Sequence, residues 1–173
     1  LAFEIISNLN FNISNEKKIN IIYALSSCSG HFGIAGGQFF DLSLKNSKVN
    51  KDNIINMQNK KTGALMGFCI EVAAILADKK NLEEKFKNIG IKLGLLFQIT
   101  DDFLDKYGSA DILGKPVQQD MAKGKNTLID FLGEDETKKL MKNLQIEIEQ
   151  DLKSLPNTNS LLNCMSFIIN RKN

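Results

Sequence analysis

The feature that most constrains the fold of this 173-residue chain is its shortage of residues that interrupt helices. It contains two prolines and twelve glycines, and 43% of its residues are hydrophobic. Proline removes a backbone donor and stops a helix, and glycine weakens one, so their scarcity favours long helices over a β fold rich in turns. We therefore expect an all-α protein. Because no linker, repeat or low-complexity block marks a boundary, residues 1–173 are expected to form a single domain.

Charge and cysteine content argue against several classes of protein. Twenty-two basic and twenty acidic residues give a net charge of +2, and no basic tract is interleaved with aromatic residues, so nucleic acid is not an expected partner. Cys28, Cys69 and Cys164 have neither the even number of a disulfide framework nor metal-type spacing, which indicates the reducing cytoplasm. The most apolar stretch, residues 62–77, is interrupted by Glu71 and is shorter than the ~20 residues of a membrane span. We expect it to be a buried core helix.

Hydrophobic periodicity predicts a succession of amphipathic helices. Candidate N-caps are Ser14, Asp52 and Asn81, since their side chains can accept a hydrogen bond from the first turn. The expected helices span residues 1–9, 15 onward, 52–77, 81–104, 134–155 and 158–170. Between them, residues 106–126 form an expected loop of a length that is usually functional or disordered.

Glycines cluster at two places where backbones are expected to come close. Four of them fall within eight residues and should interrupt the second helix or allow very close approach of another segment: Gly30, Gly33, Gly36 and Gly37. Gly90 and Gly94 lie four residues apart on one face of the 81–104 helix, which suits a close helical neighbour. His31, the sole histidine, is expected to have a local packing role, because no His-based triad or zinc site can be assembled around it.

The most informative segment is Phe-Gln-Ile-Thr-Asp-Asp-Phe-Leu-Asp, residues 97–105. On a helix, the spacing of Asp101, Asp102 and Asp105 should place three carboxylates on one face within ~6 Å of each other, with Gln98 one turn before them. Clustered carboxylates repel one another unless a cation holds them, and a set of oxygen ligands without His or Cys favours Mg²⁺, with Mn²⁺ as an alternative, over zinc. A solvated acidic helix end is the other interpretation. The apolar neighbours indicate a buried helix and favour the metal site.

Three lysines could supply the positive charge that a phosphate group needs. Lys61 begins the apolar stretch, whereas Lys115 and Lys125 lie in the glycine-bearing segment after the acidic helix. A single lysine is usually solvated surface. Together with a carboxylate-bound metal, however, these lysines form a plausible clamp for a diphosphate, because phosphate oxygens are neutralised by metal and ammonium together.

Five segments occur in an order and approximate spacing similar to the C-terminal half of short-chain trans-polyprenyl diphosphate synthases. They are Gly-Gly-Gln-Phe-Phe-Asp (36–41), Lys-Thr-Gly-Ala-Leu (61–65), the acidic segment (97–105), Leu-Gly-Lys (113–115) and Gly-Lys-Asn-Thr (124–127). The beginning Leu-Ala-Phe-Glu-Ile and the ending Phe-Ile-Ile-Asn-Arg-Lys resemble bacterial farnesyl diphosphate synthases in particular. The resemblance covers the whole chain, and the order of five motifs makes it specific.

The resemblance implies an isoprenoid-synthase-type bundle of long helices around a central cavity, here lacking the N-terminal helices. It implies an enzyme that joins an allylic diphosphate, dimethylallyl or geranyl, to isopentenyl diphosphate to give farnesyl diphosphate, as a homodimer. The three aspartates would bind Mg²⁺, with Asp101 the leading candidate for a direct ligand and a catalytic role. The lysines that would hold the allylic diphosphate are Lys61, Lys115 and Lys125, of which Lys61 and Lys125 are also candidate catalytic residues. Further pocket-lining candidates are Gln38, Asp41, Thr62 and Gln98.

One part of the family pattern is missing. The first aspartate-rich motif, its adjoining arginines and the residues that bind isopentenyl diphosphate lie N-terminal to the matching stretch. Because the chain starts in what resembles the middle of a helix, we expect a fragment of a longer enzyme, with a natural half-length protein as the alternative. The chain should be inactive alone, with apolar faces of residues 19–24 and 64–77 uncovered. The alternatives are a non-catalytic helical subunit that pairs with a full-length synthase, and a helical domain that binds Mg²⁺ without catalysis. Neither has an evident use for both the carboxylates and the lysines.

Overall fold

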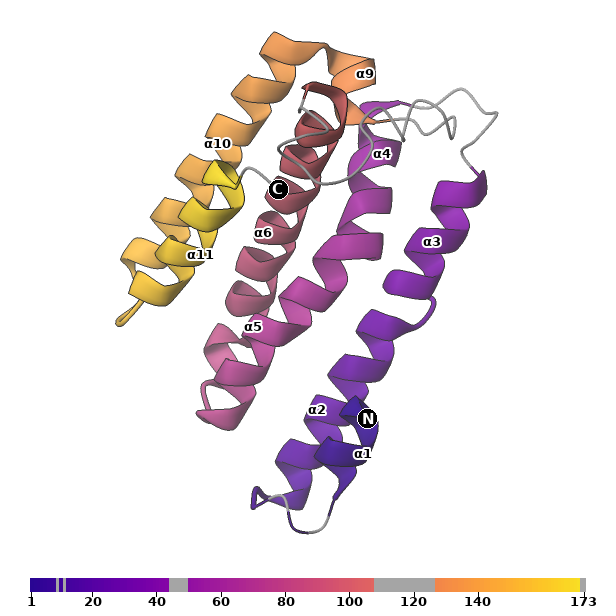
Figure 1. Cartoon of the computed structure of the whole chain (residues 1–173). Coiled ribbons are helices and arrows are strands. Elements are labelled where there is room, and N and C mark those ends of the chain that lie inside the picture. Colours follow the sequence, from indigo (N-terminus) through magenta and orange to yellow (C-terminus); the bar gives the residue numbers. More distant parts are fainter. Residues whose placement is uncertain (9, 11, 44–49, 108–126, 172–173) are drawn as a thin grey trace.

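The computed structural model describes residues 1–173 except 9, 11, 44–49, 108–126 and 172–173. The described residues form helices and contain no strand, which confirms the all-α prediction. The helices are α1 (Ala2–Ser7), α2 (Asn15–Ser29), α3 (Ile34–Ser43), α4 (Lys51–Gln58), the π-helical segment η1 (Asn59–Gly63), α5 (Ala64–Leu76), α6 (Lys80–Tyr107), α9 (Leu128–Leu132), α10 (Glu134–Lys153) and α11 (Asn159–Asn170). Figure 1 shows α2 and α3 along one side, α4, α5 and α6 in the middle, and α10 and α11 along the other side.

Two helix starts show how local capping operates in this chain. Ser14 caps α2 as expected, since its Oγ accepts a hydrogen bond from the backbone N–H of Lys17 at 3.3 Å. The prediction of Asp52 as the cap of α4 was wrong. Asn50 caps that helix, with its Oδ1 accepting from the N–H of Asn53 at 2.9 Å. Asp52 lies instead in the first turn, where a carboxylate is favoured by the positive end of the helix dipole.

The connection between α5 and α6 lies one residue earlier in the chain than the sequence indicated. Asn81 was predicted to cap α6, but the helix already begins at Lys80. The reason is the tight end of α5, where Asp78 adopts a left-handed backbone with φ of 56° and the N–H of Lys79 bonds to the carbonyl of Ala74 at 2.9 Å. This arrangement satisfies the last carbonyls of α5 and turns the chain at once into the next helix.

Helix α6 is the central element of the fold. It packs against α4, α5, α9, α10 and α11, and its apolar residues contribute to two core clusters. Leu95 and Ile99 face α4, α9 and α10, whereas Ile89, Leu93 and Leu96 face α10 and α11. The burial of this face fixes the rotation of α6 about its axis, and with it the direction of the acidic residues at its C-terminal end.

The expected close approach at Gly90 and Gly94 is confirmed. A Cβ atom at Gly90 would lie 2.6 Å from the Cα of Gly67, and one at Gly94 would lie 2.6 Å from the Cα of Gly63. Both partners are glycines of η1 and α5, so the two backbones meet without intervening side chains. The α5–α6 contact is the most extensive between any two of the described elements.

The prediction that residues 62–77 form one buried core helix was only partly right. The chain there is divided between η1 and α5, and within α5 only Gly67, Ala74 and Ile75 are fully buried. Leu65 and Leu76 are exposed, because among the described elements α5 packs chiefly against α6 on one side and α2 on another. None of the described helices is long and apolar enough to cross a bilayer.

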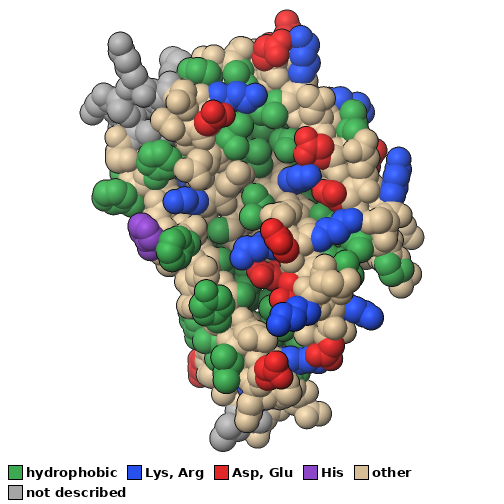
Figure 2. All heavy atoms as spheres, turned by 180° about the vertical axis from the view of Figure 1, so that it is seen from behind, with side chains coloured by type: hydrophobic (Ala, Val, Ile, Leu, Met, Phe, Trp, Pro, Cys, Tyr) green, Lys and Arg blue, Asp and Glu red, His purple; other side chains and the backbone are tan. Residues whose placement is uncertain are grey.

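Large apolar side chains are also exposed on α2, on α3 and on the turn between them. They are Ile19, Tyr23, Phe32, Phe39 and Leu42. Figure 2 shows hydrophobic side chains gathered along the edge formed by these helices. The exposure agrees with the expectation for only part of residues 19–24, since Ile21 and Ala24 are buried, and for only part of 64–77. His31 is exposed too, with its ring edge-on to the ring of Phe32 at 5.1 Å between centroids.

Candidate functional site

The C-terminal half of α6 faces η1, and side chains from the two elements form a series of hydrogen bonds. Thr62 Oγ1 donates to Gln98 Oε1 at 3.2 Å. Gln98 Nε2 in turn donates to Asp102 Oδ1, one helical turn further on, at 3.0 Å. Asp102 is only 3% exposed. The amide of Gln98 therefore holds one oxygen of a buried carboxylate and is itself oriented by Thr62.

The π-helical segment presents Lys61 beside this series. Lys61 Nζ donates a hydrogen bond to Asp41 Oδ2 at 2.6 Å, across from α3. Both side chains are partly buried, so the ion pair is less screened than one on the open surface. A π-helical turn inside a helix is uncommon and frequently marks a functional site. Nothing in the sequence pattern indicated this one.

Gly37 explains how α3 comes close enough for this ion pair. A Cβ atom at this position would lie 2.4 Å from the backbone nitrogen of Lys61 and 2.7 Å from its Cα. Because Asp41 lies one helical turn after Gly37, the close approach carries its carboxylate to the lysine. The expectation that the glycine cluster interrupts the helix and permits close approach is confirmed, with α2 ending before Gly30 and α3 beginning at Ile34.

The three aspartates do not form a ready-made metal cluster. Among the residues that the structure describes, no three His, Cys, Asp or Glu side chains converge closely enough to hold an ion. Asp102 and Asp105 are buried, whereas the side chain of Asp101 is 35% exposed. Asp102 accepts a hydrogen bond from Gln98, and Asp101 accepts one from Arg171. The role of the three aspartates as metal ligands stays a prediction.

The donor set nevertheless fits Mg²⁺ in chemical type. The acidic end of α6 offers carboxylate oxygens and the neighbouring Gln98 amide, without histidine or cysteine. Mg²⁺ typically binds to one or two carboxylates and completes its shell with waters and substrate phosphates, so three converging protein ligands are not required. Asp101 is the most exposed of the three carboxylates.

Arg171 is a site residue that the sequence interpretation missed. It follows α11, and its Nη2 donates to the carbonyl of Phe97 at 3.1 Å and to Asp101 Oδ1 at 3.2 Å. The guanidinium also lies over the Phe97 ring, 4.0 Å from its centroid. One signal was present in the sequence, since Arg171 is the sole arginine among 22 basic residues. Its partners lie 70 and 74 residues away along the chain, and no local pattern identifies them.

A second ion pair connects α9 to the C-terminal end of α6. Lys106, in the last turn of α6, donates a hydrogen bond to Asp130 of α9. Burial raises the pKa of Asp130, but hydrogen bonds from Lys106 and from Thr127, the N-cap of α9, outweigh it and leave that pKa below its usual value. Helix α9, which the sequence pattern did not predict, is thus attached just beyond Asp105.

Apart from Asp101 and Asp105, which are described above, the predicted site residues fall into three groups. Five of them make the hydrogen bonds described above, Lys61 with Asp41 in one set and Thr62, Gln98 and Asp102 in another, and the two sets are joined through the adjacent residues Lys61 and Thr62 of η1. Gln38 is exposed on α3, next to Gly37. Lys115 and Lys125 lie outside the described residues, as does most of the expected loop, although Lys106 and Tyr107 belong to α6.

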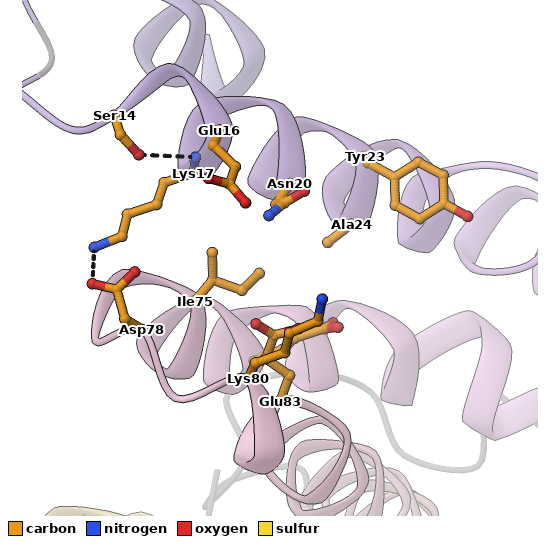
Figure 3. A pocket seen from close by; sticks show the side chains of 11 residues that line it. Ser14, Glu16, Lys17, Asn20, Tyr23, Ala24, Ile75, Asp78, Lys80 and Glu83 are labelled. Carbon is orange, nitrogen blue, oxygen red and sulfur yellow. Dashed lines mark hydrogen bonds and ion pairs between the residues drawn. The ribbon is translucent and has the colours of Figure 1, made fainter.

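A hollow of about 350 Å³ lies at the other end of α6, between α2 and the α5–α6 turn (Figure 3). Charged side chains of both signs line it, and the Lys17–Asp78 ion pair at 2.6 Å closes one side. Its residues come from the N-terminal part of α6, far along that helix from the aspartates. It is therefore separate from the candidate site.

Comparison with known proteins identifies the family of this chain. The model of the family described as Polyprenyl synthetase matches residues 1–165. A farnesyl diphosphate synthase from Micrococcus luteus is 32% identical over 172 residues, which cover 98% of this chain and 58% of the relative. A geranyltransferase structure from Helicobacter pylori, complexed with magnesium and isoprenyl diphosphate, has a TM-score of 0.80 at 25% identity, covering 98% of this chain and 55% of that one.

A geranylgeranyl pyrophosphate synthetase from Pyrococcus horikoshii has a TM-score of 0.85, again at 25% identity, with 98% of this chain and 63% of that one covered. The first curated relatives are matched over 45% to 60% of their length, so this chain spans about half of each. The family match over most of the chain, together with the shared helical fold, shows that this chain belongs to the polyprenyl synthetase family.

Proposed function

We propose that this chain carries the allylic-diphosphate half of a prenyl diphosphate synthase, which joins an allylic diphosphate to isopentenyl diphosphate. The observation that carries the proposal is the juxtaposition of Lys61 with the Thr62–Gln98–Asp102 series at the acidic end of α6. A cationic side chain and a carboxylate whose direction is fixed are the two features needed to hold a metal-bound diphosphate.

Each residue has a role that follows from its contacts. Lys61 is held by Asp41 and can exchange that carboxylate for a phosphate oxygen, which would place its ammonium against the leaving group. Thr62 and Gln98 keep the Asp102 carboxylate in one orientation. Mg²⁺ bound by Asp101, Asp102 or Asp105 would neutralise the diphosphate as it departs, with Mn²⁺ as an alternative ion. Lys115, Lys125 and Gln38 are proposed as further diphosphate and pocket contacts on the family resemblance.

The proposed product is farnesyl diphosphate. Support comes from the farnesyl diphosphate synthases that match nearly the whole chain, such as the Micrococcus luteus protein. The geranylgeranyl pyrophosphate synthetase from Pyrococcus horikoshii shares the fold as well, so a C20 product is the alternative. Analysis of the chain length of the product would distinguish the two. We propose a cytoplasmic enzyme, in keeping with three cysteines that are all free.

We further propose that the 173 residues do not turn over substrate alone, and that the exposed apolar side chains of α2 and α3 contribute to a homodimer. The chain spans about half of its curated relatives, and the proposed inactivity supposes that turnover also needs residues equivalent to the rest of their length. Gel filtration with light scattering tests the association, for which a monomer at micromolar concentration is the contrary result. Clear incorporation of radiolabelled isopentenyl diphosphate into a prenyl product by this chain alone would show that the proposed inactivity is wrong.

Binding of radiolabelled geranyl diphosphate by equilibrium dialysis with saturating Mg²⁺ tests the proposed site. Lys61→Ala should weaken binding by ~1.5–3 kcal/mol, the range for a hydrogen bond to a charged group. The matched control is Lys60→Ala, since Lys60 is the adjacent lysine and lines a different hollow with His31 and Phe39. Control binding should stay within about twofold of wild type, as expected for removal of a charge outside the site. Equal losses in both variants, or no binding by the wild-type chain, would count against the site.

A further inference from the structure

The C-terminal end of α11 is fastened to α6 at the turn that carries Asp101. Arg171 directs its side chain back onto this turn, and that side chain is only 8% exposed. It contacts the Phe97 carbonyl, the Phe97 ring and the Asp101 carboxylate at the same time. Arg171, which directly follows α11, therefore binds an oxygen of Asp101, a carboxylate that also belongs to the candidate metal site.

The choice of side chain at this position is informative. Every other basic residue in the chain is lysine. A guanidinium can stack on a ring while donating in its own plane, and it stays charged, whereas an ammonium cannot make both contacts. The contacts at Phe97 and Asp101 use these two properties of arginine together.

One hydrogen-bond donor of the Arg171 guanidinium has no acceptor among the described residues. Its Nε is buried and has no hydrogen-bond acceptor among the described residues. Burial of an unpaired donor has a free-energy cost, so the docked position depends on the Asp101 carboxylate and the Phe97 contacts. A competitor for the carboxylate would remove one of the attractions that keep the arginine in place.

Charge makes a metal ion such a competitor. Asp101 is the most solvent-accessible of the three aspartates at the acidic end of α6, and Arg171 already neutralises it. A cation that binds the same carboxylate must approach a fixed positive charge, and that repulsion weakens its binding.

We infer that Arg171 is an internal counter-cation for Asp101: it positions this carboxylate, weakens the binding of free divalent metal there, and links metal binding to the docking of the C-terminal end of α11. The inference rests on the proposed function, since it takes the acidic end of α6 to be the metal site. It assigns to Arg171 a positioning role and no contact with substrate.

The test is the affinity of the purified chain for Mn²⁺ without diphosphate, measured by electron paramagnetic resonance. Arg171→Gln should bind Mn²⁺ more tightly than wild type by about 3- to 10-fold, the scale of removing a partly exposed charge pair and its repulsion. Arg171→Lys should return the affinity to within about twofold of wild type, because it restores the charge. Hydrogen exchange at the end of α11 should be faster in both variants, since neither keeps the stacked, forked contact.

The matched control is Lys92→Gln. Lys92 is also on α6 and forms ion pairs, with Glu147 and Asp151 of α10, but it lies more than two helical turns before Asp101. At physiological salt, a charge at that distance is beyond the ~8 Å screening length, so this variant should bind Mn²⁺ like wild type.

Each outcome has one meaning. Unchanged or weaker Mn²⁺ binding in Arg171→Gln, in a protein whose thermal unfolding shows that it is folded, would overturn the counter-cation role. The same holds if Lys92→Gln tightens binding equally, because net charge alone would then explain the effect. If the wild-type chain and every variant fail to bind Mn²⁺ even with inorganic pyrophosphate added, the proposed metal site itself is wrong.

Discussion

Replacement of Gly90 by alanine should push α5 and α6 apart. A Cβ atom at this position would lie 2.4 Å from the carbonyl oxygen of Met66 and 2.6 and 2.7 Å from the Cα and N of Gly67. All three are backbone atoms, so no side-chain rotation can relieve the contact. Because ordinary contact distances begin near 3.4 Å, the two helices must separate by roughly 1 Å over their most extensive interface.

The expected cost is the difference between two opposing effects. Overpacking typically costs about 1–3 kcal/mol, and a clash with backbone atoms, which cannot rotate away, should fall in the upper part of that range, at about 2–3 kcal/mol. Alanine in a helix is about 1 kcal/mol better than glycine, which offsets part of that loss. The net destabilisation should be about 1–2 kcal/mol, equivalent to a fall in Tm of roughly 2–8 °C for a chain of this size.

Gly63→Ala is the matched control, because it makes the same substitution at the same helix interface. The nearest atoms to a Cβ there belong to Ile91 at 3.2–3.4 Å, a separation that small adjustments can absorb. Urea unfolding followed by circular dichroism at 222 nm would compare the two variants. If Gly90→Ala is as stable as wild type, or if Gly63→Ala is the more damaging of the two, the close-approach reasoning is refuted.

Two further predictions concern titratable groups. Burial raises the pKa of Asp130, but hydrogen bonds, first from Lys106, outweigh that effect and lower the pKa below its usual value of 3.8. The contribution of this carboxylate to stability is therefore present above the pKa of the unfolded state. It is lost as the pH falls through the lower pKa of the folded state. Asp130→Asn should thus cost about 0.2–1 kcal/mol near pH 7 and less in acid, in urea titrations at several pH values; a constant difference would contradict this. Burial raises the pKa of the Cys28 thiol, so at neutral pH it should react with a disulfide reagent more slowly than the exposed Cys69 and Cys164, and an equal rate would be the contrary result.

Features set by local sequence were predictable. The Ser14 cap, the helical class and the close-approach glycines depend on neighbours within a few residues, or on the absence of a side chain, and these leave direct traces in the sequence. The spacing that places Gln98 one turn before Asp102 is also a local property of a helix, and the structure shows the hydrogen bond between them.

Features that depend on tertiary contacts were not predictable from those patterns. The sequence of the π-helical turn at Asn59–Gly63 is compatible with an ordinary helix. Its functional importance depends on the contact of Lys61 with Asp41 of α3, which is a tertiary contact. The contact of Arg171 with Asp101 joins two parts of the chain about seventy residues apart. Helical spacing likewise fixes the face of α6 on which an aspartate lies, but it does not fix which tertiary partner the side chain takes.

The most direct test of the central claim is isothermal titration of geranyl diphosphate into the purified chain, with Mg²⁺ and then with a chelator. If the acidic end of α6 binds a metal-bound diphosphate, binding should require Mg²⁺, and Asp101→Asn should weaken it at least tenfold, the scale of a lost charged ligand. Asp52→Asn, which changes an exposed acidic residue in the first turn of α4, should leave it unchanged. Equal affinity in the presence of the chelator, or in Asp101→Asn, would contradict the proposed site.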